Sequence, residues 1–255
     1  MTVRVGMGER AGPGLLVLID PSRTSPDDAA RLGREAAAAG AAGILIGSSF
    51  DGTRDTHLVA GALRAAALGI PVILFPGSAM QLTEQVDLVL FLSLVSGRNP
   101  QYLIEEHVRA VPFLERHPLP TLSTGYILID GGRVTSVEAV SQTRPLPANK
   151  PELVAAHAMA ARLIGMQAIY LDAGSGADRP VPAEVIHACR TAVSAGVPPV
   201  TLLVGGGIRR PEQAAVARRA GADYVVIGTV LEGTEGGGGD GGPESLQAFV
   251  RAVSG

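Results

Sequence analysis

The stretch LLVGGGIRRPEQA (202–214) joins a short apolar run to three glycines and a helix-forming segment, and DYVVIGTVLEG (223–233) begins in the same way. Such apolar runs are typical of parallel strands buried on both faces. In an α/β barrel, glycine loops after the seventh and eighth strands bind phosphate, because they expose backbone N–H groups beside a helix amino terminus. The two junctions predict a parallel α/β fold with a phosphate site, although tight turns alone would also explain the glycines.

Further apolar runs of the same kind occur toward the amino terminus, with helix-forming stretches between them. They are LLVLID (15–20), AGILIG (42–47), PVILFP (71–76), DLVLFLS (87–93), TGYILID (124–130) and AIYLDA (168–173), which brings the total to eight. Several of the intervening stretches end on glycine, as helices commonly do. The alternation predicts an α/β (β/α)8 TIM barrel. A doubly wound open sheet is the structural alternative, because periodicity does not distinguish the two.

Three segments depart from regular alternation. Only about ten residues, GSAMQLTEQV (77–86), separate strands three and four, which predicts a reduced third helix. After strand five, 131–149 has the composition of an extra β-turn excursion rather than a helix. The run GTEGGGGDGG (233–242) is a Gly-rich loop before the last helix, 243–255.

The overall composition limits the classes of function. A length of 255 residues suits one barrel or two ordinary domains; no boundary is visible, so we expect a single domain over 1–255. No membrane-length apolar run or secretory leader is present, and the cytoplasm is the expected location. A net charge of −3 and 4% aromatic residues argue against nucleic-acid binding. The single cysteine, Cys189, has no neighbours at metal-ligand spacing and is expected in the core.

Polar residues follow strands one, two and six, where chemistry is expected in a barrel. Asp172 can accept hydrogen bonds from substrate hydroxyls, and Gly174-Ser175-Gly176 offers phosphate donors, which together indicate a polyol phosphate. Ser175 does not fit a nucleophile elbow, because glycine stands immediately on both sides of it. Asp20, with Ser48 and Ser49, suits Mg²⁺ that shares a diphosphate ligand, although Asp20 could equally cap a turn.

The segments LIDPSR, IGSS, SGRNPQYLI, GYILIDGG, KPELVAAHAMA, YLDAGSGA, VGGGI and VIGT occur in an order and spacing that resembles the geranylgeranylglyceryl phosphate synthase family, in its longer second group. The resemblance implies a TIM barrel without a normal third helix. It also implies an Mg²⁺-dependent prenyltransferase that joins a polyprenyl (about C20) diphosphate to the hydroxyl of sn-glycerol 1-phosphate and releases pyrophosphate.

The resemblance also implies roles for individual residues. Asp20 and Ser49 would bind Mg²⁺, and Asp20, Tyr170 and Asp172 would be catalytic. Arg98 and Asn99 of the SGRNP motif would either contact a substrate or shape their loop. The acceptor, a three-carbon phosphate, would be held by Tyr170, Leu171, Asp172, Ala173, Gly174, Ser175, Gly176, Gly206, Gly207, Gly228 and Thr229.

The chain departs from the family pattern at three places. The family usually has glutamate at Asp172, often has DPDK where this chain has DPSR (20–23), and usually has glycine at Ser48. A shorter carboxylate would tolerate an acidic acceptor better, since like charges repel. We therefore keep 3-phosphoglycerate, the acceptor of related moenomycin-type prenyltransferases, as an alternative. The near absence of lysine, with Lys150 alone, suggests a GC-rich genome, which suits a bacterium that makes such a product.

Two other classes of function remain open from the sequence. A sugar-phosphate isomerase would need an acid and a base at the rim, which Asp20 and Asp172 could supply. A non-catalytic phosphate or lipid carrier would need neither carboxylate for turnover. The apolar helix residues 153–165 predict a homo-oligomer, and an amphiphilic product allows peripheral membrane contact.

Overall fold

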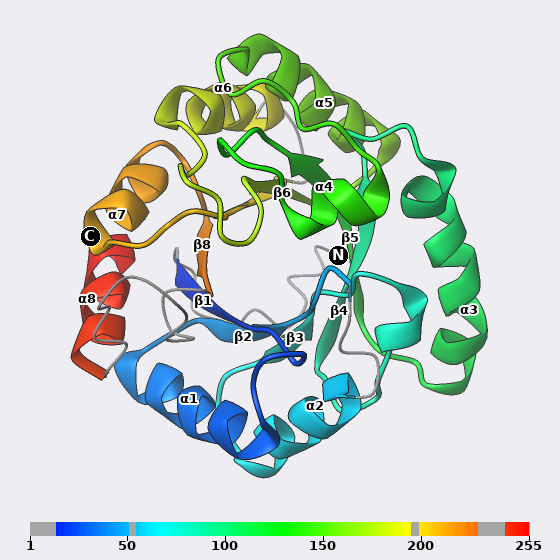
Figure 1. Ribbon diagram of the computed structural model, residues 1–255, viewed down its shortest axis with the longest axis vertical. Helices are drawn as coiled ribbons and strands as arrows, with labels where there is room; N and C mark the ends of the chain where they lie inside the picture. The colour runs from blue at the N-terminus through cyan, green and yellow to red at the C-terminus, as the bar shows by residue number, and fades with distance from the viewer. Residues whose placement is uncertain (1–13, 51–54, 195–198, 229–242, 255) are drawn as a thin grey trace.

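In the computed structural model, which describes residues 14–50, 55–194, 199–228 and 243–254, the strands form a closed parallel barrel in chain order (Figure 1). The ring closes where Gly14 to Val17 of β1 pair with Tyr224 to Ile227 of β8, which confirms the barrel over the open sheet. The strands are β1 (Gly14–Ile19), β2 (Gly43–Ile46), β3 (Val72–Leu74), β4 (Leu88–Leu94), β5 (Thr121–Leu128), β6 (Ala168–Asp172), β7 (Thr201–Gly205) and β8 (Tyr224–Ile227).

Helices surround the barrel, and local sequence explains where several begin and end. At the start of α1, the Ser25 hydroxyl accepts a hydrogen bond from the Asp28 amide, and Gly40 ends the helix at a φ of 92°. Gly165 ends α5 in the same conformation, at 105°. The helices are α1 (Pro26–Ala39), α2 (Asp55–Ala65), α3 (Glu106–Arg116), α4 (Ser136–Ser141), α5 (Pro151–Ile164), α6 (Ala183–Ser194), α7 (Pro211–Arg219) and α8 (Pro243–Ser254). Among the described residues, no helix combines the length and apolarity needed to cross a membrane.

Two apolar cores follow from the alternation of side chains along each strand. In β1, Leu16 belongs to the core inside the barrel, whereas Leu15 and Val17 belong to the core between barrel and helices. Cys189 is fully buried in this outer core, as predicted, and burial raises the pKa of its thiol to about 12. Both cores contain side chains from every strand, so the barrel is filled rather than hollow.

The connection between β3 and β4 contains no α-helix, and this confirms the prediction of a reduced third helix. Its regular structure is a single 3₁₀ turn, η1 (Ala79–Gln81). The next helix, α3, is preceded by one turn of π-helix, η2 (Gln101–Glu105), and packs beside η1. Figure 1 shows the stretch of the ring between α2 and α3 where a full helix would otherwise lie.

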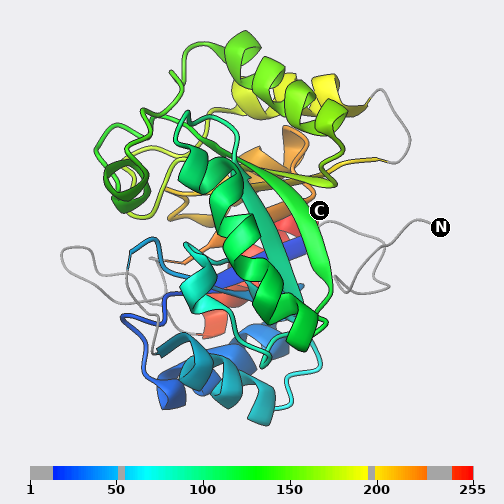
Figure 2. The ribbon, with the colours of Figure 1, turned by 90° about the vertical axis from the view of Figure 1, so that its right-hand side faces the viewer.

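The excursion after β5 was predicted without a helix, and that prediction was wrong. Residues Ser136 to Ser141 form the six-residue helix α4; the Ser141 hydroxyl donates to the Val137 carbonyl, and Gln142 ends the helix in the left-handed conformation. Extended pairing is limited to one bridge between Ile129 and Leu146. Figure 2 shows α4 at one end of the barrel. The Gly-rich run 233–242 lies outside the described residues.

Candidate active site

A polar cavity lies at the carboxyl ends of the strands and unites most of the predicted site residues. Its wall takes side chains or backbone from β1, β2, β6, β7 and β8 and the loops that follow them, as expected for a barrel enzyme. The predicted residues that line it are Asp20, Ser49, Tyr170, Asp172, Ser175, Gly176, Gly206, Gly207 and Gly228. The structure therefore brings residues that were predicted for the metal and for the acceptor to one cavity.

Three of the described residues that were predicted to hold the acceptor do not line this cavity. The side chains of Leu171 and Ala173 point into the outer core, because they alternate with the inward-facing residues of β6. Gly174 contributes indirectly, since its amide donates to Asp172 Oδ1 at 2.8 Å. Thr229 lies outside the described residues.

Asp172 is the buried carboxylate of the cavity. Tyr126 Oη donates a hydrogen bond to Asp172 Oδ2 at 2.5 Å, and the Gly174 amide binds the other oxygen. Burial raises the pKa of Asp172 above its ordinary value, and these two hydrogen bonds oppose the rise. A carboxylate with a raised pKa, facing a substrate cavity, is suited to accept a proton from a hydroxyl group.

Tyr126 is a site residue that sequence reasoning missed as such. It lies directly opposite Tyr170 in the pairing of β5 with β6, and both rings project into the barrel. The alternation of the GYILID segment could have placed Tyr126 on the inner face, had its register against β6 been known. Burial first, and then the neighbouring Asp172, raise the pKa of both tyrosines well above the ordinary value, so both remain protonated.

An aromatic cluster belongs both to the cavity wall and to the core inside the barrel. Phe75 lies 5.1 Å from Tyr170 and 5.8 Å from Tyr126 between ring centroids, and the two tyrosines are 5.5 Å apart. Such spacing is favourable for tilted and edge-to-face aromatic contacts. The three rings thus pack against one another in the wall of the polar cavity.

The glycine loops approach Asp172 closely, which explains their composition. Gly206 has a φ of +79°, and a Cβ there would contact Asp172 Oδ1 and lie 2.6 Å from the Gly174 amide nitrogen. Only glycine satisfies both constraints. Arg209, which also lines the cavity, was not predicted; its guanidinium donates to the carbonyls of Gly176 and Ala177 at 3.3 and 3.1 Å and so joins the two loops.

Asp20 is both a turn cap and a residue of the cavity wall. It caps its own turn, because Oδ1 accepts from the amide and the hydroxyl of Ser22, at 2.9 and 2.7 Å. It also faces the cavity with its side chain 23% exposed, and Arg23 Nε lies 3.9 Å from Oδ2. Within the described ranges, no group of three or more acidic, histidine or cysteine side chains could hold a metal.

The oxygen donors around Asp20 nevertheless fit a Mg²⁺ site in which the protein supplies only one or two ligands. Mg²⁺ is often bound by one or two carboxylates and completes its shell with water and substrate phosphates. Asp20 and Ser49 provide one carboxylate and one hydroxyl on the same cavity wall.

Arg98 and Asn99 do not line this cavity. Arg98 donates to the Gly97 carbonyl, and Asn99 donates to the Ser141 carbonyl of α4, so both shape their loop.

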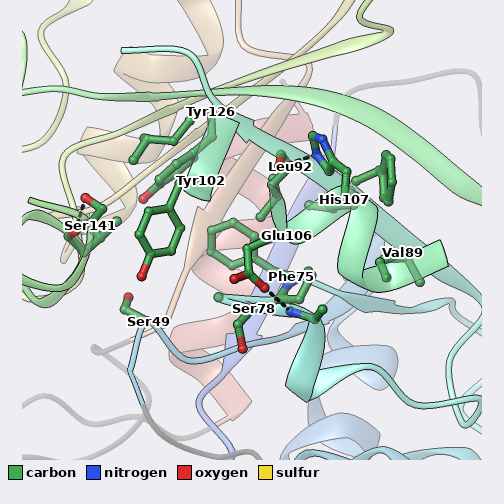
Figure 3. A pocket seen from close by; sticks show the side chains of 18 of the residues that line it. Ser49, Phe75, Ser78, Val89, Leu92, Tyr102, Glu106, His107, Tyr126 and Ser141 are labelled. Carbon is green, nitrogen blue, oxygen red and sulfur yellow. Dashed lines mark hydrogen bonds between the residues drawn. The ribbon is translucent and has the colours of Figure 1, made fainter. Parts of the chain in front are cut away.

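An apolar groove continues from the polar cavity. The two share Ser48, Ser49, Phe75 and Tyr126, and the groove then runs between η1, β4 and α3 (Figure 3). Its wall is mostly hydrophobic and includes Leu82, Val89, Leu90, Phe91, Leu92, Leu94, Tyr102, Ala110, Val137 and Val140. The groove lies beside the connection between β3 and β4, where the short turn η1 replaces a full helix.

A protein-family model described as the PcrB family matches residues 9–250. The chain belongs to the PcrB family. Curated relatives of this PcrB-family protein include the geranylgeranylglyceryl phosphate synthase of Thermofilum pendens, which is 42% identical over 86% of the chain and 83% of the relative. The protein of the same name from Chitinophaga pinensis is 41% identical over 85% of the chain and 83% of the relative.

A solved structure that resembles this PcrB-family protein carries the same name as these curated relatives. The (S)-3-O-geranylgeranylglyceryl phosphate synthase of Thermoplasma acidophilum, solved in complex with its substrate sn-glycerol-1-phosphate, superimposes with a TM-score of 0.86. It is 29% identical, and the match covers 96% of the chain and 94% of that structure. The resemblance inferred from the ordered sequence motifs is thereby confirmed.

Proposed function

We propose that this protein transfers a polyprenyl group of about twenty carbons from its diphosphate to the hydroxyl of sn-glycerol 1-phosphate, with release of pyrophosphate. The observation that carries the proposal is the continuity of a polar, glycine-lined cavity with an apolar groove. One substrate of this reaction is small and anionic, and the other carries a long hydrocarbon chain. The names of the relatives and the acceptor bound to the Thermoplasma enzyme support the same reaction.

The acceptor phosphate is proposed to bind at Gly176, Gly206, Gly207 and Gly228, whose backbone lines the polar cavity. This places the acceptor hydroxyls toward Asp172. The bond between the allylic carbon and the diphosphate oxygen breaks, the acceptor oxygen forms the ether bond, and its proton passes to the Asp172 carboxylate. Tyr170 and Tyr126 fix the orientation of the acceptor and of Asp172.

The diphosphate is proposed to lie near Asp20 and Ser49, at the junction of cavity and groove. Mg²⁺ held by these two residues would neutralise the charge that develops on the leaving diphosphate. The prenyl chain then occupies the apolar groove, where its hydrocarbon surface is removed from water.

Glycerol 1-phosphate is favoured over 3-phosphoglycerate by the surroundings of Asp172. This carboxylate is buried, and the hydrogen bonds to it come from one hydroxyl and one amide. A substrate carboxylate at the same place would add a second negative charge in a poorly solvated site. A sugar-phosphate isomerase is disfavoured, because its polar substrate would not need the apolar groove.

Steady-state assays with both acceptors test this proposal. Each acceptor is combined with farnesyl and geranylgeranyl diphosphate, with Mg²⁺ or with a chelator, and pyrophosphate release is measured. We expect Mg²⁺-dependent turnover with glycerol 1-phosphate and its loss in Asp20→Ala. Inactivity with every pair of substrates would exclude the prenyltransferase function, and turnover that survives Asp20→Ala would exclude the assigned metal site.

The proposal also covers the cellular location of the protein and its assembly into an oligomer. We infer action in the cytoplasm, with peripheral membrane contact by the amphiphilic product, and assembly into a homo-oligomer. Leu163 and Ile164 of α5 are 75% and 74% exposed, and such an apolar surface suits a subunit contact. Light scattering of the purified protein and of Leu163→Ser tests the assembly; a monomeric wild-type protein would exclude it.

A further inference from the structure

Glu106 is a charged residue in the wall of the apolar groove, at the start of α3. Its side chain is 14% exposed. A carboxylate in such surroundings is costly unless hydrogen bonds or opposite charges compensate it. The partners of Glu106 therefore indicate what the residue does.

Two partners come from its own segment of chain. Arg109 Nη1 lies 2.8 Å from Glu106 Oε1, and Gln101 Nε2 donates to the same oxygen at 3.0 Å. These two contacts fix the orientation of the Glu106 carboxylate through its oxygen Oε1. The other oxygen, Oε2, is left to face η1.

The third partner lies across the groove. The amide of Ala79, the first residue of η1, donates to Glu106 Oε2 at 2.7 Å (Figure 3). Ser78 precedes η1 but makes no side-chain capping bond. Glu106 thus caps η1 from a different element and joins the two walls of the groove.

The same short segment is tied on its other side to the diphosphate end of the site. Gln81 Oε1 accepts from the Gly77 amide at 2.8 Å, and Gln81 Nε2 donates to the Ser48 carbonyl at 2.9 Å. Ser48 precedes Ser49 and lines both the cavity and the groove. A chain of hydrogen bonds therefore runs from α3 through η1 to the end of β2.

We propose that Glu106 is a positioning residue that holds η1 against α3 and so sets the width of the groove that receives the prenyl chain. This inference rests on the proposed function, because the groove is assigned to the prenyl substrate there. With no helix after β3, η1 is a single turn packed beside α3, and the Glu106 carboxylate is bonded to its first amide.

Three variants test the tether. Glu106→Ala removes the acceptor, and Glu106→Gln retains an oxygen that can accept from Ala79 but loses the charge. Glu105→Ala is the matched control, since Glu105 is adjacent, is 52% exposed and has an ion pair with the same Arg109 at 3.7 Å. Two readouts are measured: KM for each substrate, and hydrogen exchange of the Ala79 and Gly77 amides.

In Glu106→Ala we expect the KM for geranylgeranyl diphosphate to rise roughly tenfold, the cost of one unpaired buried group, with the KM for glycerol 1-phosphate unchanged. The Ala79 amide should exchange faster, and Glu106→Gln should restore part of both effects. Glu105→Ala should match wild type.

Equal increases in both KM values, or unchanged exchange at Ala79, would overturn the inference. A different result, a wild-type protein that does not use any prenyl diphosphate, would exclude the proposed function but not the tether. The exchange measurement decides the tether even then, because it needs no turnover, and Glu106→Gln decides it if the alanine variant does not fold.

Discussion

At the scale of single residues, the site depends on opposing influences on Asp172. Burial raises the pKa of the carboxyl, whereas the Tyr126 hydroxyl and the Gly174 amide lower it. With its pKa raised, Asp172 is a stronger proton acceptor than an exposed aspartate. Tyr126 therefore acts on the chemistry through Asp172 rather than through its own ionisation.

Replacing Tyr126 with phenylalanine tests this coupling. The Tyr126 hydrogen bond lowers the pKa of Asp172, so its removal should raise that pKa further. Because the ionised carboxylate accepts the proton, the acidic limb of the pH profile of kcat/KM should move to higher pH. We expect a loss of roughly tenfold or more near neutrality that diminishes as pH rises. A profile with the wild-type shape would contradict the assigned role.

Cys189 offers a second test at this scale. Complete burial in the outer core raises the pKa of its thiol to about 12, so almost no thiolate forms at pH 8. A thiol-specific reagent should label the native protein far more slowly than the protein in denaturant. Rapid labelling of the native protein would show that α6 does not pack as described.

At the scale of elements, the loops after β6 and β7 form one unit. Arg209 joins them, and Gly206 allows the β7 loop to contact Asp172. The proposed phosphate site is therefore built on loops that contact one another. A change in one loop is expected to move the other, and this coupling can be measured.

The substitution Gly206→Ala should disrupt this unit. The new methyl group would contact Asp172 Oδ1, and the φ of +79° is unfavourable for alanine. We expect a loss of about 1–3 kcal/mol in the free energy of unfolding and a large rise in the KM for glycerol 1-phosphate.

Gly165→Ala provides the control for that substitution. Gly165 lies at the end of α5 with a φ of +105°, and a methyl group added there would meet no atom within 4 Å. It should lose similar stability with no change in KM. Equal KM values in the two variants would show that the β7 loop does not require glycine for binding.

Most elements were predictable because each is encoded locally. The strand runs, the short link 77–86 and the final helix were recognised from composition and spacing alone. Tyr126 and Arg209 were not recognised as site residues, because their contacts join strands and loops that are distant in the chain. The helix α4 was missed because six residues are too few to show helical periodicity.

At the scale of the whole molecule, ligand binding should be visible as stability. A ligand that binds only the folded barrel stabilises it by about 2.7 kcal/mol at one hundred times its Kd. For a chain of this length we expect glycerol 1-phosphate to raise the Tm by roughly 5–10 °C. Glycerol without phosphate should give no shift, since we propose that the glycine loops bind the phosphate group. An equal shift with both compounds would contradict the assigned phosphate site.

The closure of the ring by β1 and β8 also has a consequence for biosynthesis. β1 leaves the ribosome before the other strands of the barrel, and its partner, residues 224–227, is the last of these strands to be made. Until then the growing sheet has two unpaired edges, which are sites of aggregation. A chain cut off before residue 224 would lack β8, so its sheet would stay open and the proposed phosphate site would be incomplete. Translation past β8 is therefore the step that commits this chain to a stable, functional form.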